Sequence, residues 1–234
     1  MFEKQSWTKK DIEQFYNFLE GIKNQKKVEW TRKIINTNMP LLAIKTPVIK
    51  DIAKQISKGN FISFLQQRPF KYYDSLAICG LLIPKINDFD TMVNHLLEFS
   101  KIIDNWANCD LLKFNINSNE EKYFLLSKKL LSSKMTFERR IGVIILFEFI
   151  KKEDYLEKIF NCLNQLFDEK EYYVNMACAW LVCELFIKQR DKTLNFLKTN
   201  TLNYFVLNKA ILKCRDSYRV SEQDKYMLLN FKKN

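Results

Sequence analysis

The sequence has few of the residues that build tight turns, disulfide frameworks or metal sites. Four glycines and four prolines in 234 residues leave little turn chemistry for a sheet-rich fold. One histidine, His95, and six cysteines with no CxxC pair provide no familiar zinc site. We expect His95 on a helix surface or in a core, and most cysteines packed as small hydrophobes at helix positions. The sequence therefore predicts helices, no metal and a cytosolic protein.

Long apolar runs and nucleotide-binding loops are also missing. The most apolar stretch, 142–150, is short and contains Glu148, whereas a membrane span needs about 18 apolar residues. The N-terminus lacks the basic-then-apolar pattern of a signal peptide. No GxxxxGK[ST], GxGxxG or GxSxG motif occurs, which argues against nucleotide-driven enzymes, dehydrogenases and serine hydrolases. We expect no membrane insertion, no nucleotide and no other cofactor.

The chain is strongly basic, with 38 Lys and Arg against 27 Asp and Glu, a net charge of +11. This excess favours a polyanionic partner, nucleic acid first and an anionic membrane surface second. However, only seven of the basic residues are arginines, and Asn and Ile are abundant. AT-rich coding produces the same bias without any function, so charge alone leaves the partner open.

Apolar residues recur at helical spacing along the whole chain, and several helix starts can be read. Thr46 followed by Pro47 predicts an N-cap and a helix over 47–58. Ser118 predicts the start of a helix over 119–132, and Ser221 the start of the last helix. We expect about twelve to fourteen helices of three to four turns. No Ser/Gly/Pro-rich linker divides the chain, so a single domain, 1–234, is predicted.

Similar helix starts recur at a nearly constant interval. Tyr72, Asn105, Arg139 and Tyr172 are separated by 33, 34 and 33 residues. A period of this size is typical of stacked helix pairs, because one pair cannot bury its apolar face alone. The predicted fold is all-α, a right-handed α-solenoid of HEAT-like or ARM-like helical repeats. The polar and aromatic helix starts are placed on its concave face.

Trp106 and Asp110 are the strongest candidates for chemistry. They are four residues apart in a predicted helix, so an indole and a carboxylate share one face. Such pairs commonly have a structural role, with the tryptophan in a core and the aspartate in a cap or ion pair. Two features favour a site instead: Asn105 and Asn108 add polar groups around the indole, and Trp180 occupies the matching register of another repeat helix.

Five short segments in the same order resemble those of a known protein family. The segments are 42–48, 103–110, 137–142, 179–181 and 209–219. Over about residues 28 to 231 the chain resembles the DNA alkylation repair family, the AlkD-like bacterial DNA glycosylases built from HEAT-like repeats. The first 25 or so residues match poorly and are interpreted as a variable N-terminal capping helix. The chain departs from glycosylase members at Asn105, where they carry a second tryptophan.

The resemblance implies a catalytic site without metal or cofactor. It implies release of N3- or N7-alkylated purines from double-stranded DNA, without flipping the damaged base into a pocket. Asp110 would be the catalytic carboxylate, and Trp106 and Trp180 would flank the sugar. Arg140 would contact DNA. No lysine is evidently placed for a Schiff base, so a monofunctional enzyme is expected, acting as a monomer in the bacterial cytosol and associated with the nucleoid.

Further residues are expected to contact phosphates because they are basic or lie at a helix start. Together with Arg140, these DNA-binding candidates are Arg139, Thr46, Lys50, Lys113, Lys209, Lys213 and Arg215. Two other functions stay open. One is a non-catalytic scaffold for damaged, branched or distorted DNA, and the other is a helical-repeat adaptor between proteins.

Overall fold

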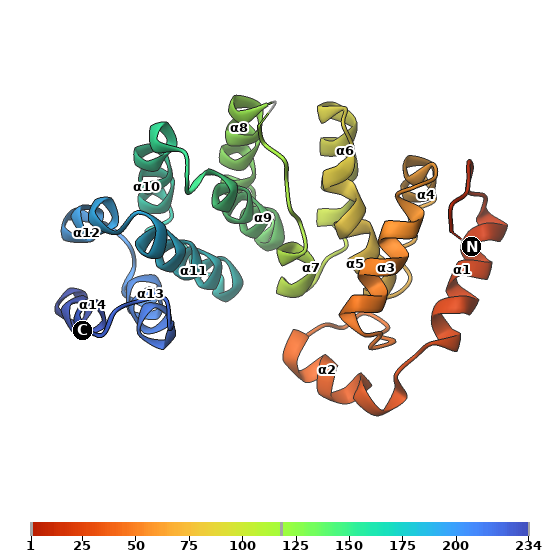
Figure 1. Cartoon of the computed structure of the whole chain (residues 1–234), viewed down its shortest axis with the longest axis horizontal. Coiled ribbons are helices and arrows are strands. Elements are labelled where there is room, and N and C mark those ends of the chain that lie inside the picture. The colour runs from red at the N-terminus through yellow and green to blue at the C-terminus, as the bar shows by residue number, and fades with distance from the viewer. Residues whose placement is uncertain (1, 118, 234) are drawn as a thin grey trace. The chain divides into compact units, whose positions relative to one another are not determined.

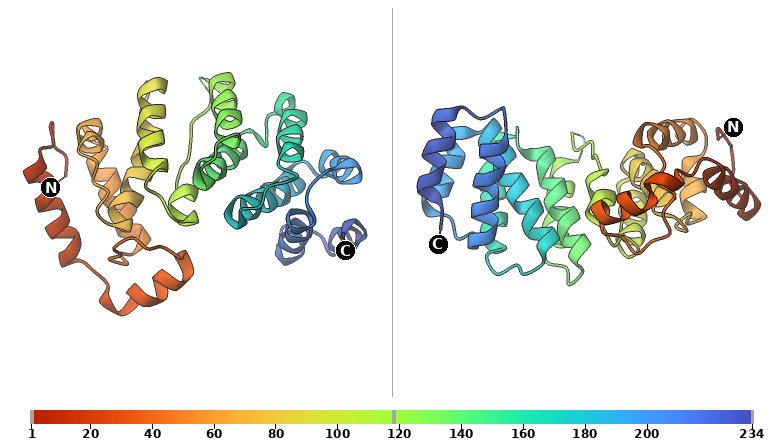
Figure 2. Two further views of the ribbon diagram at one scale, coloured as in Figure 1. Left: turned by 180° about the vertical axis from the view of Figure 1, so that it is seen from behind. Right: turned by 90° about the horizontal axis from the view of Figure 1, so that it is seen from below.

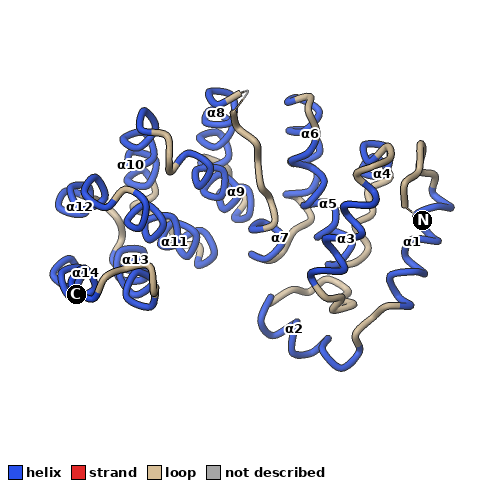
Figure 3. Tube along the Cα trace, in the orientation of Figure 1, coloured by secondary structure: helices blue, strands red, loops and turns tan. Residues whose placement is uncertain are grey.

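The described part of the chain, residues 2–117 and 119–233, is built from helices. In the computed structural model these residues form fourteen α-helices and five short 3-10 turns, and none of them lies in a strand (Figures 1 and 3). The all-α prediction is confirmed, and the helix count falls at the upper end of the expected range. The chain divides into two compact units, Met1–Asn115 and Ile116–Asn234. Each unit is described by itself, and the single repeat domain stays a prediction.

The first unit contains seven of these α-helices. They are α1 (Lys9–Gly21), α2 (Val28–Ile35), α3 (Thr46–Ile56), α4 (Phe61–Gln66), α5 (Tyr73–Leu82), α6 (Phe89–Ser100) and α7 (Trp106–Asp110). Within the unit, α5 contacts α3, α6 and α7. Helix α5 is therefore buried on nearly all sides, from Asp74 to Gly80 and at Leu82. It is the central element against which the two helices that carry candidate residues, α3 and α7, are packed.

The second unit contains the other seven α-helices. They are α8 (Glu120–Leu131), α9 (Thr136–Leu146), α10 (Leu156–Gln165), α11 (Tyr172–Lys188), α12 (Arg190–Thr199), α13 (Tyr204–Asp216) and α14 (Glu222–Leu228). Helix α9 packs on α8 and α11, and α11 packs on α12 and α13. Figure 2 shows α9, α11 and α13 side by side, in green to blue. This row of helices carries all of the candidate residues of the unit.

Some predicted helix starts need correction. Helix α3 begins at Thr46 with Lys45 as its N-cap, so Thr46 lies inside the helix and does not cap it, and the helix ends at Ile56. Helix α9 begins three residues before Arg139, at Thr136. The Ser221 cap is confirmed, because its side chain accepts a hydrogen bond from the Asp224 backbone. Ser118 lies outside the described residues.

Helix lengths vary more than predicted. Helix α7 has five residues and α11 has seventeen. All six cysteines are buried, as expected for small hydrophobes, and His95 is half-buried on α6. None of the helices among the described residues is long and apolar enough to cross a membrane.

Candidate functional site

Trp106 and Asp110 are the first and last residues of α7, which confirms that they share one helix. The helix begins here because the side chain of Asn105 accepts a hydrogen bond from the Asn108 backbone, at 3.0 Å. This cap satisfies one of the backbone donors that a helix start leaves without an intrahelical partner. Both Trp106 and Asp110 are partly exposed. A carboxylate and an indole are thus presented together by one short, capped helix.

The sequence suggested that Asn105 and Asn108 add polar groups around the indole, and the structure gives both of them buried positions. Asn105 and Asn108 are completely buried, because one caps the helix and the other faces the interior. The Asn108 side-chain amide is one of the few buried polar groups among the described residues without a hydrogen-bond partner. A buried polar group without a partner lowers the free energy of unfolding by about 1–3 kcal/mol. Unsatisfied groups of this kind are rare in native structures and need an explanation.

The Trp106 indole is held by the C-terminal end of α2. Its Nε1–H donates to the Ile34 carbonyl oxygen at 3.4 Å. Next to it, the Asp104 carboxylate accepts hydrogen bonds from the Thr37 hydroxyl at 2.6 Å and from the Asn38 backbone at 2.7 Å. These bonds connect the loop after α2 to the loop before α7. The orientation of Trp106 therefore depends on a segment about 70 residues away in the sequence.

The phosphate-binding candidates of the first unit lie on open surface. Thr46 and Lys50 are exposed on the first turns of α3, and Lys113 is exposed shortly after α7. The segment before α3 is fixed by Asp74 of α5, whose carboxylate accepts hydrogen bonds from the Leu42 and Ile44 backbones, each at 2.8 Å. Burial raises the pKa of Asp74, and these backbone donors oppose that shift only in part.

The two arginines of α9 are bound to the segment just before and at the start of α11. Arg139 forms a two-pronged ion pair with Glu169, with Nε–Oε2 at 2.6 Å and Nη2–Oε1 at 3.1 Å. Arg140 is 4% exposed and donates to the Tyr173 carbonyl oxygen. The structure thus gives both guanidinium groups protein partners and little open surface. Their contact with DNA stays a prediction.

Trp180 lies partly exposed on α11 and is held by an aromatic and an acidic neighbour. Its ring centroid is 4.3 Å from that of Phe147, and its indole is hydrogen-bonded to the Glu184 carboxylate. Glu184 also accepts from Arg219, with Nη1–Oε2 at 2.9 Å. The Arg219 hydrogen bond holds the pKa of Glu184 below its usual value despite its burial. Trp180 is therefore oriented by a charged pair.

Helix α13 brings together two of its three basic candidates. Lys209 and Arg215 line a hollow of about 250 Å³ next to Phe205 and Tyr204. The Lys209 ammonium lies 5.8 Å from the centre of the Phe205 ring, a cation–π arrangement. Lys213, half-buried, does not line this hollow. This combination of cations and aromatic rings suits a phosphate backbone and its sugars.

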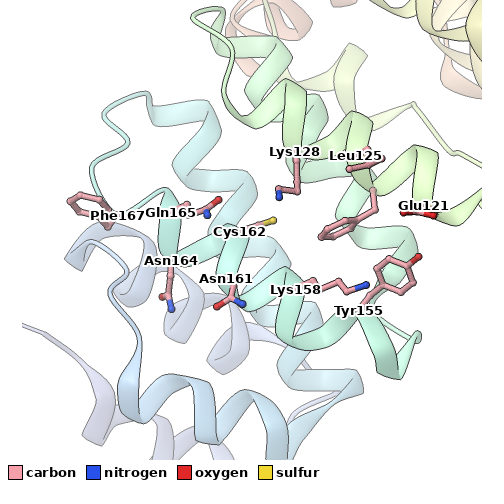
Figure 4. Close-up of a pocket in the computed structure, with 11 residues that line it drawn as sticks. Glu121, Leu125, Lys128, Tyr155, Lys158, Asn161, Cys162, Asn164, Gln165 and Phe167 are labelled. Carbon is pink, nitrogen blue, oxygen red and sulfur yellow. The ribbon is translucent and has the colours of Figure 1, made fainter.

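A larger hollow of about 950 Å³ lies between α8 and α10 (Figure 4). Lys128, Lys158 and Tyr155 line it together with several amide and apolar side chains. No residue predicted from the sequence to act in catalysis or DNA binding lines it. Its volume alone does not assign it a ligand, and we build the site on the residues described above.

The predicted residues divide between the two units. Trp106, Asp110, Thr46, Lys50 and Lys113 belong to the first unit, and Arg139, Arg140, Trp180, Lys209, Lys213 and Arg215 belong to the second. Sequence reasoning missed Glu184, which bonds the Trp180 indole, and Asp104, which links the loop before α7 to the loop after α2. Asp104 had no local signal, because its partner Thr37 is 67 residues away.

Comparison with known proteins provides the family. The model of the family described as DNA alkylation repair enzyme matches residues 17–213. A comparison with curated proteins gives no match. The matched span covers most of both units and all of the predicted site residues except Arg215. The chain belongs to the DNA alkylation repair enzyme family.

Proposed function

We propose that this protein is a monofunctional, metal-independent DNA glycosylase that removes cationic N3- and N7-alkylated purines from double-stranded DNA. The observation that carries the proposal is the pairing of Trp106 and Asp110 on the capped helix α7, partly exposed in a chain of this family. The helix pairs form a right-handed HEAT-like solenoid whose concave face receives the duplex. The protein acts as a monomer in the bacterial cytosol.

The chemistry requires one well-placed carboxylate. A purine alkylated at N3 or N7 is cationic and leaves as a neutral base when its bond to C1′ breaks, so no strong general acid is needed. Positive charge then develops on the deoxyribose, and the Asp110 carboxylate stabilises it. A water molecule adds its oxygen to C1′, and its proton passes to Asp110 or to solvent. The products are the free base and an abasic site.

The tryptophans and the basic residues support this step. The indole faces of Trp106 and Trp180 attract the cationic sugar and exclude water, which strengthens the field of Asp110. Thr46, Lys50 and Lys113, and the α13 group of Lys209, Lys213 and Arg215, bind phosphates and set the position of the duplex. Arg139 and Arg140 are proposed as further DNA contacts. Their bonds to Glu169 and to the Tyr173 carbonyl oxygen also hold α9 against the start of α11.

The test is release of free base from duplex DNA that contains N7-methylguanine, by the wild-type protein and by Asp110→Asn. Loss of a single electrostatic group of this kind lowers the rate by about 10²–10³-fold. Asp90→Asn is the matched control, since Asp90 is exposed on α6 of the same unit and the charge change is identical. Binding without release above the spontaneous rate would contradict the glycosylase proposal and favour a DNA-binding scaffold. Absence of DNA binding would favour the protein adaptor.

A further inference from the structure

Helix α2 exposes an unusual amount of apolar surface. Trp30 is 62% exposed and Ile34 is 49% exposed, and residues four apart share one face of a helix. The other side of α2 is anchored, because Val28 and Ile35 are buried. An exposed tryptophan next to an exposed isoleucine on a fixed helix is a common mark of an interaction surface.

The surroundings of this face are basic. Lys23, Lys26, Lys27 and Lys33 are all exposed, with Glu29 as the exposed acid among them. The Lys27 ammonium lies 5.9 Å from the centre of the Trp30 ring. A hollow of about 520 Å³ adjoins the start of α2, and Lys23, Lys26 and Lys45 line it. An apolar face bordered by lysines complements a polyanion that also offers sugar and base surface.

The same helix is connected to the candidate catalytic helix. The Trp106 indole donates to the Ile34 carbonyl oxygen, and Asp104 receives hydrogen bonds from Thr37 and Asn38. The Arg32 guanidinium holds the loop between them by donating to the Thr37 carbonyl oxygen at 2.8 Å. All of these residues belong to the first unit. A molecule bound to α2 at Ile34 would therefore lie next to the Trp106 side chain.

We propose that α2 is a DNA-docking element of the same site, in which Trp30 and Ile34 press against the duplex beside Trp106. This inference rests on the proposed function. Apolar side chains inserted into the minor groove contact sugars and partly unstack base steps, and aromatic rings stack on bases. The lysines on either side bind the phosphates of the two strands, and Asp104 positions Trp106 through the α2–α7 connection.

The docking role is tested by the affinity of Trp30→Ala for a duplex with one N7-methylguanine, measured by fluorescence anisotropy. Trp30 is exposed, so the substitution leaves the core intact. We expect Kd to rise about tenfold, in line with the strength of base–aromatic contacts. Tyr226→Ala is the matched control, because Tyr226 is 72% exposed on α14 in the second unit. An unchanged Kd for Trp30→Ala would overturn the inference.

Other outcomes separate this inference from the proposed function. If the wild type binds the duplex but releases no base, and Trp30→Ala still weakens binding, the docking element stands and the glycosylase proposal fails. If the wild type releases the base and Trp30→Ala binds normally, only the docking element fails. A dimer in sedimentation experiments that Trp30→Ala dissociates would assign the α2 face to a second copy of the chain, which also overturns the inference.

The positioning role of Asp104 has its own readout. In Asp104→Asn the amide nitrogen cannot accept a hydrogen bond, so one of the bonds from Thr37 and Asn38 is lost. We expect base release at saturating DNA to slow about tenfold, while Kd stays within about twofold of wild type. A general loss of structure would instead reduce the fraction of binding-competent protein. An unchanged rate would overturn the positioning role.

Discussion

Each half of the chain contains a buried carboxylate, but the two have different partners. Asp74 in the first unit is 1% exposed and accepts hydrogen bonds from the neutral backbone groups of Leu42 and Ile44. The Glu169 side chain in the second unit is 6% exposed and faces the Arg139 guanidinium. Burial acts to raise the pKa of both groups. For Asp74 the pKa stays raised, whereas the hydrogen bonds of Glu169, led by that from Arg139, bring its pKa below the usual value.

This difference indicates how each unit holds its candidate residues. Neutral donors fix the position of a carboxylate without fully offsetting the loss of water, whereas a cation stabilises the ionised form. The hydrogen bonds to Asp74 therefore fix the segment before α3, while the burial of its charge lowers the free energy of unfolding. The Glu169 arrangement links α9 to the start of α11 and depends on both charges being present. The effects of substituting these two carboxylates on the free energy of unfolding should accordingly differ in size and in their dependence on pH.

Glu169→Gln is expected to have the largest effect on stability. It leaves the largely buried Arg139 charge without its counter-ion, and breaking one side of such a pair costs about 3 kcal/mol or more. Urea unfolding at pH 7 measures the loss. Glu153→Gln is the control, because Glu153 is exposed and its ion pair with Lys192 should contribute less than about 1 kcal/mol. Equal effects of the two substitutions would mean that the Arg139–Glu169 pair does not hold α9.

The two carboxylates should respond to acid in opposite directions. The pKa of Glu169 is lowered by folding, so its stabilisation is present above its unfolded pKa and is lost as the pH falls through the folded pKa. The pKa of Asp74 is raised, so its contribution is present below its unfolded pKa and is lost as the pH rises through the folded pKa. Each slope is at most about 1.4 kcal/mol per pH unit.

Unfolding free energies of Glu169→Gln and Asp74→Asn, each compared with wild type from pH 3 to pH 6, measure these slopes. The difference between wild type and Glu169→Gln should shrink toward low pH. The unfolding free energy of wild type minus that of Asp74→Asn should become more positive toward low pH. Two differences that change in the same direction would contradict the distinction between the neutral and the cationic partner.

The fold class and the family could be predicted from sequence because their signals are local. Helical spacing of apolar residues, the Ser221 cap and the short ordered segments each depend on neighbours within a few positions. The buried position of Asn105 had a local signal too, since asparagine is a favoured N-cap and accepts from the residue three positions on. The structure shows this capping bond at Asn105, where the sequence analysis expects a polar group beside the indole.

The partners of the site residues could not be predicted in the same way, because they are far apart in the sequence. Trp106 and Asp104 have partners 72 and 67 residues away, but several other polar links in the chain have separations close to the repeat interval of about 33 residues. Arg140 reaches Tyr173, 33 residues on, and Arg190 reaches Asp224, 34 residues on. The Leu42 backbone reaches Asp74 at a separation of 32. In a chain of stacked helix pairs, polar residues about one period apart are candidates for such links.

Two glycines, one in each unit, test how closely neighbouring helices pack within that unit. We expect the smallest effects on stability at these positions. A methyl group added at Gly142 would lie 3.0 Å from the Leu131 backbone nitrogen and the Ser127 carbonyl oxygen of α8. One added at Gly80 would first meet the Phe99 ring, at 3.2 Å. Alanine gains about 1 kcal/mol over glycine in a helix, while overpacking costs about 1–3 kcal/mol.

We therefore expect Gly142→Ala to lower the free energy of unfolding by about 1 kcal/mol, because α8 must move as a whole to make room. Gly80→Ala should stay within about 0.5 kcal/mol of wild type, because a ring can shift by a few tenths of an ångström and the gain in helix propensity compensates. Thermal unfolding of the two variants side by side measures the difference. A larger loss for Gly80→Ala would show that α5, and not the α8–α9 contact, is the more tightly packed part of the chain.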